Sequence, residues 1–558
     1  MTADDPILNH SQKQAIEYNK GPLLVVEGAG TGKTTTLVEK IKLLIKDGHI
    51  KPDEILCLTF TEKAAYEMQE RVDLAMPYGY TRMWISTFHA FADEVLKDDI
   101  FHLGLNPAYE LMTPAQSIMF LKKNIFSLKL DYFRPMTNPH KFLEGLLHHF
   151  SRLHDEDISP EEYENWVAKS SDIQPSHPEL ACLPAGRIQD PVNDRFRIKS
   201  GMTILSETVD EIAQLKELSY AYSSFQKLKQ QHDVMDFDDL IYYLLKLYRE
   251  RPSVLKQYQT KFKVVLVDEF QDTNIAQYEL IKLLCPPQNN PQLTVVGDDS
   301  QAIYKFRGAS VSNILNFMED YPKAKQITLN DNYRSNQAVL DHAYQLIKHN
   351  DPDTLEVKLG ISKELKSHAK QEAHAVKFEF FRHGDREADW IANKIQTLVK
   401  TKGYELSDFA ILVRANNHAE SIMNALRYTG IPYQFVGPGT LFKQPEIKDL
   451  ICYLKVLVDL NDTVSLYRVL TMNLFEIDQQ DVALLFAFTK KASLSFFQSL
   501  EAALSFRYDE WYRDSYESYR EHLPLLRDET IEKLAEIMTM IKDHLNKVKS
   551  DSAAQILY

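Results

Sequence analysis

The sequence predicts an α/β fold built on parallel sheets, with helical insertions between strands. Short apolar runs of the kind found in buried parallel strands recur at 23–26, 55–58, 264–267 and 293–296. A glycine-rich turn follows the first run, and a helical pattern from about Thr34 to Lys46 follows that turn. Strand, turn and helix in this order are typical of parallel α/β domains.

A mostly helical stretch interrupts the α/β pattern between residues 113 and 235. We expect it to be an insertion between two parts of one α/β domain, 1–112 and 236–326. Within the insertion, prolines and a glycine break any helical period from 171 to 205, which indicates an irregular loop without an assigned function.

The second half of the chain repeats the order of sheet and helices. Apolar runs at 378–381 and 409–413 predict strands of a second α/β domain over 327–447. From residue 448 to residue 558 the sequence is helical in pattern, which indicates a second helical subdomain.

Composition limits the class of protein. The 558 residues are 44% apolar and 26% charged, and the net charge is −15, which by itself argues against a protein that coats nucleic acid non-specifically. The four cysteines lie far apart without a CxxC, so we expect no zinc cluster or disulfide framework. No run approaches the ~18 apolar residues of a membrane span, and the acidic N-terminus lacks an apolar segment. We therefore expect a cytoplasmic protein without membrane contact.

The glycine-rich turn directly after the first apolar run is typical of a phosphate-binding loop. Its backbone N–H groups and the start of the helix would surround phosphates, Lys33 would reach the β and γ phosphates, and Thr34 would offer a hydroxyl to Mg²⁺. The strict GxxxxGK[ST] pattern has glycine where Glu27 stands, and the alternative is an ordinary strand-to-helix turn. The predicted loop consists of Gly28, Ala29, Gly30, Thr31, Gly32, Lys33 and Thr34.

Two carboxylates follow the run at 264–267. Asp268 would complete the Mg²⁺ shell with Thr34, and Glu269 would orient or deprotonate an attacking water. An acidic pair alone is more often a solvated strand end. Its place behind a predicted phosphate-binding loop favours the catalytic interpretation.

A polar and aromatic segment follows the next run, at 293–296. Gln301 would sense the γ-phosphate, since ligands bind at the carboxyl ends of parallel strands. Tyr304, Phe306 and Arg307 combine two aromatic rings and a cation, which suits stacking on unpaired bases and contact with a phosphate. The two aromatic side chains could equally belong to a core.

Taken in order from Leu8 to Leu457, these segments resemble the motifs of superfamily 1 DNA helicases of the UvrD/Rep/PcrA type. The resemblance rests on Gln12 with its neighbours, Thr59–Ala65, Thr87–His89, Asp236–Leu240, Val267–Asn274, Val296–Ala309, Asn332–Ser335 and Glu446–Leu454. It departs from the family at Glu62, where asparagine is more common, at Thr35, where arginine is common, and at Phe306, where tryptophan is usual.

The resemblance implies RecA-like domains of a P-loop NTPase that uses ATP and Mg²⁺. Gln12 would read the adenine, Tyr333 would pack on it, and Arg334 would reach the γ-phosphate from the second α/β domain. The catalytic set would be Lys33, Asp268, Glu269, Gln301 and Arg334. Single-stranded DNA would contact Phe60, Thr87, His89, Phe237, Tyr304, Phe306 and Arg307. Such proteins hold one strand by stacking and a few cations, so the acidic net charge no longer excludes DNA.

The implied function is an ATP-dependent 3′-to-5′ helicase acting on single-stranded and forked DNA, in repair or recombination and with partner proteins of those processes. The family's motifs V and VI are not found before Tyr558, so we expect the second α/β domain and the second helical subdomain to be incomplete. One alternative is therefore a truncated, ATP-gated module that binds single-stranded DNA with little or no unwinding. Another is an incomplete gene product whose remainder is encoded nearby.

Overall fold

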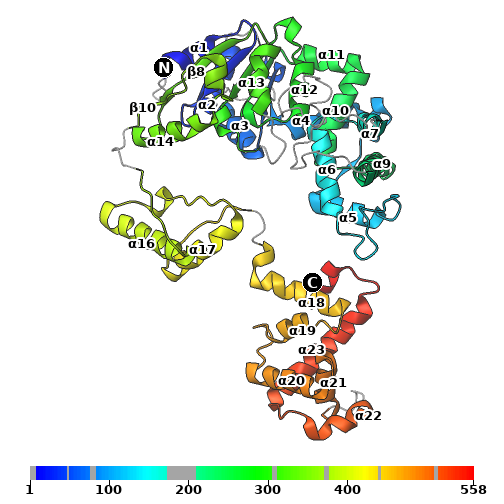
Figure 1. Cartoon of the computed structure of the whole chain (residues 1–558). Helices are drawn as coiled ribbons and strands as arrows, with labels where there is room; N and C mark the ends of the chain where they lie inside the picture. Colours follow the sequence, from blue (N-terminus) through cyan, green and yellow to red (C-terminus); the bar gives the residue numbers. More distant parts are fainter. Residues whose placement is uncertain are drawn as a thin grey trace. The chain divides into compact units, whose positions relative to one another are not determined.

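The computed structural model describes residues 8–46, 50–75, 83–172, 209–304, 311–369, 376–437, 441–507 and 513–557. It divides into two compact units, Met1–Lys377 and Phe378–Tyr558, each considered by itself below. Figure 1 shows the sheet and its helices in the first unit and helices in the second.

A six-stranded sheet forms the centre of the first unit. Its order is β3-β2-β6-β7-β1-β8, and every neighbouring pair is parallel. The strands are β1 (Leu23–Glu27), β2 (Ile55–Thr59), β3 (Trp84–Thr87), β6 (Val264–Val267), β7 (Gln292–Gly297) and β8 (Lys325–Leu329). The α/β fold class and the four apolar runs predicted as strands are thus confirmed.

Side chains of the central strands alternate between two cores, as the two-residue period of a strand requires. On β1, for example, Leu24 and Val26 join one core while Leu23 and Val25 join the other. The first core is covered by α4 (Phe88–Asp99), α10 (Phe237–Glu250), α12 (Ile275–Leu284) and α13 (Val311–Asp320). The second is covered by α1 (His10–Glu17), α2 (Lys33–Lys46) and α3 (Glu62–Ala75).

The insertion is helical and has a core of its own. Its long helices are α5 (Pro114–Asn124), α6 (Leu143–Asp155), α7 (Pro160–Asp172) and α9 (Val209–Gln231), which lie together in Figure 1. The chain enters and leaves through the short parallel strands β4 (Glu110–Leu111) and β5 (Val234–Met235). Most of the predicted loop at 171–205 lies outside the described residues.

Lys229 ties the insertion to the sheet domain. Its ammonium, in a side chain only 2% exposed, lies 2.6 Å from a carboxylate oxygen of Asp236 and 2.7 Å from one of Asp239. Asp236 also caps α10 by accepting a hydrogen bond from the backbone N–H of Asp239. One buried cation therefore joins the end of α9 to the start of α10.

Residues after 326 continue the first unit beyond the domain boundary expected from the sequence. β8 pairs with β1 along its whole length. Its apolar residues Ile327 and Leu329 belong to the second core of the sheet, which α1, α2 and α3 cover. The chain then forms β9 (Asp331–Asn332), α14 (Gln337–Ile347), α15 (Leu355–Leu359) and β10 (Lys366–Ser367), all within Met1–Lys377. Earlier in the chain, α11 (Pro252–Lys261) follows α10 and precedes β6.

The described residues of the second unit form helices joined by irregular segments, with no strand among them. α16 (Gly384–Lys402) packs on α17 (Ala419–Tyr428) through a small apolar core. A larger core joins helices further along: α18 (Pro445–Val458), α19 (Thr463–Leu470), α20 (Gln479–Ala492), α21 (Phe496–Ser505), α23 (Asp528–Lys547) and α24 (Ala553–Leu557). The helical pattern predicted after residue 448 is confirmed. No helix in the described ranges is both long and apolar enough to cross a membrane.

The prediction of strands at 378–381 and 409–413 is wrong. Both segments are without strand structure, and Phe378, Phe380 and Leu412 are 87%, 76% and 94% exposed. A strand requires a hydrogen-bonded neighbour, and among the described residues none pairs with either segment. The apolar runs alone therefore led to a prediction that tertiary pairing does not support.

Replacing Lys229 with methionine tests the buried cation. We expect Lys229→Met to lower the free energy of unfolding by about 3–5 kcal/mol, because two carboxylates would remain buried without a counterion. Urea unfolding of the full chain measures the change. Lys227→Met, at an exposed position on the same helix, is the control and should stay within about 0.5 kcal/mol of wild type; equal effects of the two substitutions would refute the assignment.

Asp155 provides a pH-dependent test of the contact between α6 and α12. Its carboxylate accepts a hydrogen bond of 2.7 Å from Asn274, the cap of α12, and burial followed by the charge of Asp238 raises its pKa to about 7. The folded protein thus holds this proton more tightly than the unfolded chain. The stability that protonated Asp155 contributes to the folded state is fully present below about pH 4 and is lost as the pH rises through about 7.

We therefore expect the stability of wild type relative to Asp155→Asn to fall between pH 5 and pH 7, since asparagine keeps the acceptor and does not titrate. Urea midpoints of both proteins across this range provide the measurement. Parallel pH profiles would contradict the raised pKa.

Candidate functional site

The carboxyl ends of the six parallel strands bring most of the predicted site residues to one edge of the sheet. Each strand is followed by a predicted or observed site segment: Gly28 after β1, Phe60 after β2, Thr87 at the end of β3, Asp268 after β6, Asp298 after β7 and Asn332 after β8. Crevices at this edge are where parallel α/β sheets bind ligands. Segments separated by more than 300 residues thus share one site.

The predicted phosphate-binding loop has the required backbone geometry. Gly30 and Gly32 have φ values of 78° and 92°, which side-chain-bearing residues rarely adopt. Thr31 donates from its hydroxyl to the carbonyl of Gly28 at 2.9 Å, and α2 begins at Lys33 directly after the turn. The unpaired N–H groups at the start of α2 therefore face the loop, an arrangement that favours anions.

A chain of polar contacts connects Lys33 to the segment after β7. The Lys33 ammonium lies 2.8 Å from a Glu269 carboxylate oxygen, which also accepts from the Gln271 amide at 2.7 Å. The side-chain carbonyl oxygen of Gln271, Oε1, accepts from the backbone N–H of Asp298 at 3.0 Å. Gln301 donates to the Asp298 carboxylate at 2.7 Å. The structure therefore connects Gln301 to Lys33 through three intervening residues.

Negative charge exceeds positive charge around Lys33. Glu27 and Asp268 are 0% and 5% exposed, and Glu269 is adjacent. Burial raises the pKa of Glu27 well above its usual range, while burial and the charge of Glu269 raise the pKa of Asp268 to about 6. Carboxylates crowded in this way fit a divalent cation, and Thr34 and Asp268 offer oxygen atoms of the kind that Mg²⁺ prefers.

Glu27 is buried beside the loop, whereas the sequence indicated it only as a departure from the strict loop pattern. Its Oε2 accepts from the Thr31 hydroxyl at 3.2 Å, and its Oε1 has no hydrogen-bond partner among the described residues. The buried carboxyl lies beneath the loop where a strict pattern would have glycine.

The segment after β8 lies against the phosphate-binding loop. The Asn332 amide donates to the carbonyl of Ala29 at 2.5 Å, and the backbone N–H of Tyr333 donates to the carbonyl of Gly30 at 3.0 Å. A Cβ atom on Gly30 would lie 2.7 Å from the Cβ of Arg334. Tyr333 and Arg334 therefore lie beside the loop, within the first compact unit.

Gln12 approaches the loop from the other side. Its amide donates to the carbonyl of Thr31 at 2.9 Å, and with Asn9 it forms a capping box at the start of α1. Asn9 in turn donates to the Tyr333 hydroxyl at 3.2 Å. The predicted adenine contacts Gln12 and Tyr333 thus belong to one polar network.

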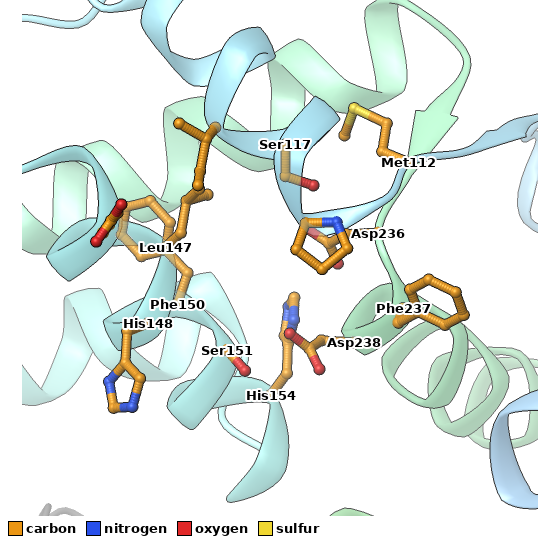
Figure 2. A pocket seen from close by; sticks show the side chains of 13 residues that line it. Met112, Ser117, Leu147, His148, Phe150, Ser151, His154, Asp236, Phe237 and Asp238 are labelled. Carbon is orange, nitrogen blue, oxygen red and sulfur yellow. The ribbon is translucent and has the colours of Figure 1, made fainter. Parts of the chain in front are cut away.

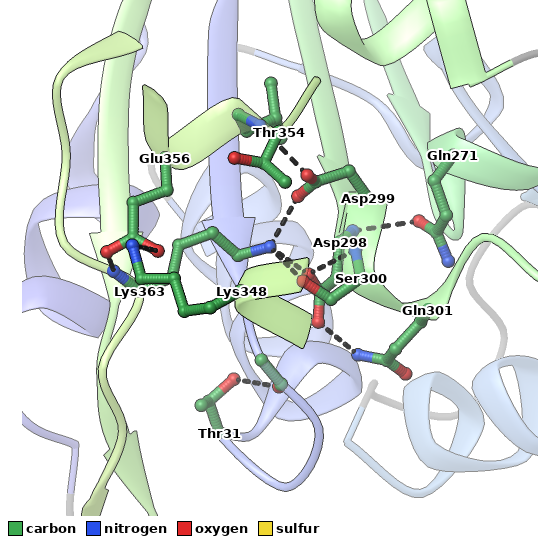
Figure 3. Close-up of polar contacts among 12 residues, drawn as sticks. Thr31, Gln271, Asp298, Asp299, Ser300, Gln301, Lys348, Thr354, Glu356 and Lys363 are labelled. Atoms are coloured by element: carbon green, nitrogen blue, oxygen red, sulfur yellow. Dashed lines mark hydrogen bonds and ion pairs between the residues drawn. The ribbon is translucent and has the colours of Figure 1, made fainter. Parts of the chain in front are cut away.

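Lys363 is a site residue that the sequence did not indicate. Figure 3 shows its ammonium among the residues that follow β7, 2.5 Å from an Asp298 oxygen and 2.7 Å from the Ser300 hydroxyl. It also forms an ion pair with Asp299. An isolated lysine in a polar segment carries no motif, so only the fold identifies it.

The predicted DNA contacts form two aromatic pairs. The rings of Phe60 and Tyr304 are 5.2 Å apart, and those of His89 and Phe237 are 6.4 Å apart. Phe60, Tyr304 and His89 are partly exposed, and Phe237 is 45% exposed, so none of the four is a core residue. Thr87 caps α4 through its hydroxyl. The two remaining predicted contacts, Phe306 and Arg307, lie outside the described residues.

Gly30→Ala tests the close approach of the segment after β8. We expect nucleotide affinity to fall at least tenfold, because the new methyl group would be strained at positive φ and would collide with Asn332 and Arg334. Titration with a fluorescent ATP analogue measures affinity. Gly104→Ala is the control, since Gly104 has a φ of 76° with open space around it; unchanged affinity in Gly30→Ala would argue against this geometry.

Comparison with known proteins agrees with the motif order. The family model described as UvrD/REP helicase N-terminal domain matches residues 8–322, and the UvrD-like helicase C-terminal domain matches 327–555. The second match extends nearly to the end of the chain, so it does not confirm the expected truncation, which stays a prediction.

Individual relatives are similar over most of this chain. The ATP-dependent DNA helicase PcrA of Bacillus subtilis is 33% identical over 498 residues, covering 88% of this chain and 59% of the relative. The proteins of the same name from Leuconostoc citreum and Staphylococcus epidermidis are 33% and 31% identical, covering 83% and 88% of this chain. The chain spans 54% and 59% of those two relatives. With the site at its expected sheet edge and a family model matched over more than half of its residues, the chain belongs to the UvrD/Rep helicase family.

Proposed function

We propose that this chain binds ATP with Mg²⁺ and couples ATP hydrolysis to 3′-to-5′ movement along single-stranded DNA and to duplex unwinding. The observation that carries the proposal is the chain of contacts from Lys33 through Glu269 and Gln271 to Asp298. It connects the phosphate-binding loop with the segment that leads to Tyr304.

The proposal assigns a side chain to each step of nucleotide chemistry. Lys33 and the start of α2 would hold the phosphates, and Thr34 and Asp268 would hold Mg²⁺, which when bound neutralises charge on the phosphates. Glu269 would orient and deprotonate the attacking water. Gln301 and Arg334 would respond to the γ-phosphate, the first through Asp298 and the second from beside Gly30.

The coupling to DNA follows from the order of residues after β7. Tyr304 lies three residues beyond Gln301, and its ring contacts Phe60 after β2. A change in the hydrogen bond between Gln301 and Asp298 would therefore shift one member of an aromatic pair that stacks on bases. Stacking of this kind is worth about 1–3 kcal/mol per base and depends little on sequence.

The domain assignment that goes with this function remains a proposal. It comprises a first RecA-like domain at 1–112 and 236–326, the insertion at 113–235, a second RecA-like domain at 327–447 and a helical subdomain at 448–558. Forked DNA as substrate, cytoplasmic location and repair or recombination proteins as partners belong to the same proposal.

A second candidate is an ATP-gated module that binds single-stranded DNA without unwinding it. The observation that favours it is that the family's motifs V and VI do not occur among the 558 residues. An arginine that stabilises the transition state of phosphoryl transfer is worth about 10³–10⁵ in rate. Such a module would bind ATP and DNA with almost no DNA-stimulated hydrolysis.

Phosphate release with and without single-stranded DNA separates the two functions. For the helicase we expect DNA to stimulate hydrolysis, and Glu269→Gln to lower the stimulated rate about 10²–10⁴-fold because the general base is lost while ATP still binds. Duplexes with a 3′ or a 5′ tail then test polarity: displacement only from the 3′-tailed duplex is expected.

Lys20→Gln, at an exposed position before β1, is the control and should hydrolyse ATP at the wild-type rate. Strand binding without stimulated hydrolysis would support the binding module instead. Displacement only from the 5′-tailed duplex would overturn the polarity.

A further inference from the structure

A pocket of about 330 Å³ lies between the insertion and the start of α10. Figure 2 shows the residues around it: Ser117 on α5, residues 236 to 238 at the start of α10, and Leu147, His148, Phe150, Ser151 and His154 on α6. Ligand pockets range from about 300 to 1,000 Å³, so this one suits a small ring system.

The Ser117 hydroxyl has no hydrogen-bond partner in the part of the chain that the structure describes. The side chain lines the pocket, the residue is 5% exposed, and its Oγ contacts no donor or acceptor among the described residues. A buried hydroxyl without a partner destabilises the folded chain. A ligand in the pocket would remove that destabilisation.

The charged groups of the pocket exclude phosphate. Glu144, Asp236 and Asp238 line it, and no lysine or arginine does. Asp236 is neutralised by Lys229, whereas Asp238 receives a hydrogen bond from Ser151 and keeps acceptor capacity. The ligand should therefore offer N–H donors and carry no negative charge where it enters the pocket.

The walls are apolar and suit a flat ring. Met112, Ile118, Leu147 and Phe150 supply them, so a planar heterocycle would bury its faces while its edge reaches Ser117 and Asp238. Phe237, which contacts His89 and is a predicted DNA contact, also lines the pocket and lies at its edge in Figure 2. A strand stacked on Phe237 would thus present a neighbouring base to the pocket.

We propose that this pocket receives one unpaired base of the bound strand, selected for an exocyclic amino group, with cytosine as the probe. The amino group would donate to Asp238, and the Ser117 hydroxyl would donate to an acceptor on the ring. Carboxylates accept from the cytosine amino group in this way, whereas thymine offers a carbonyl at the same position. The inference rests on the proposed function, because it requires that the chain binds single-stranded DNA.

The test compares a thymidine 20-mer with the same strand carrying a single central deoxycytidine, without nucleotide, by fluorescence anisotropy. We expect the cytosine to tighten binding about tenfold, or about 1.4 kcal/mol. Ser117→Leu, which fills the pocket, should abolish the preference. Asp238→Asn, which replaces the negative carboxylate by a neutral amide with one acceptor oxygen, should lower it. Both variants should leave affinity for the thymidine strand unchanged.

The matched control is Ser219, a serine on α9 that is also buried with an unpartnered hydroxyl among the described residues but does not line the pocket. Ser219→Ala should keep the cytosine preference, and Ser117→Ala should lower it. Thermal unfolding of all variants identifies any that misfold, in which case the two alanine variants, which only remove a hydroxyl, decide the question.

The outcomes separate the pocket from the proposed function. Equal affinity of wild type for the two strands would overturn the pocket while binding to DNA stands. Failure to bind either strand would overturn the proposed function and the pocket together. Competition by free cytidine that disappears in Ser117→Leu, without a preference between strands, would assign the pocket to a free nucleoside and overturn its assignment to the strand.

Discussion

The ion pair between Lys33 and Glu269 is the contact on which the rest of the site depends. It joins the loop after β1 to the carboxylates after β6, two segments 236 residues apart, across the edge of the sheet. Because Glu269 also accepts from Gln271, the position of one ammonium is transmitted to Asp298 at the end of β7. Any ligand that draws Lys33 away must also disturb that network.

Among the described residues of the first unit, three lysines that are largely shielded from solvent each face a pair of carboxylates. Lys33 faces Asp268 and Glu269, Lys229 holds Asp236 and Asp239, and Lys363 holds Asp298 and Asp299. Buried ion pairs of this kind add little net stability, yet removing one partner is strongly unfavourable. They therefore fix which segments lie together, and they show how a chain with a net charge of −15 keeps acidic residues inside.

Sequence reasoning succeeded where a local pattern has a local cause. The strands at 23–26 and 264–267 are buried on both faces, because their alternate side chains lie in two different cores. The glycines at 30 and 32 adopt the positive φ that the loop needs. The prediction failed at 378–381, where an apolar run is present but no strand among the described residues pairs with it. Whether a segment becomes a strand depends on a neighbour that its own residues do not specify.

The sequence by itself determined the α/β class, the phosphate-binding loop and the order of the helicase motifs, because each depends on residues close together along the chain. Only the tertiary structure decided the role of Lys363, the contact of Tyr333 with Gly30, and the pocket beside Ser117. The contacts of Lys363 and Tyr333 join residues from 63 to 303 positions apart. Such proximity follows from how parallel strands align their carboxyl ends and from which cation neutralises which buried carboxylate, and neither leaves a local pattern in the sequence.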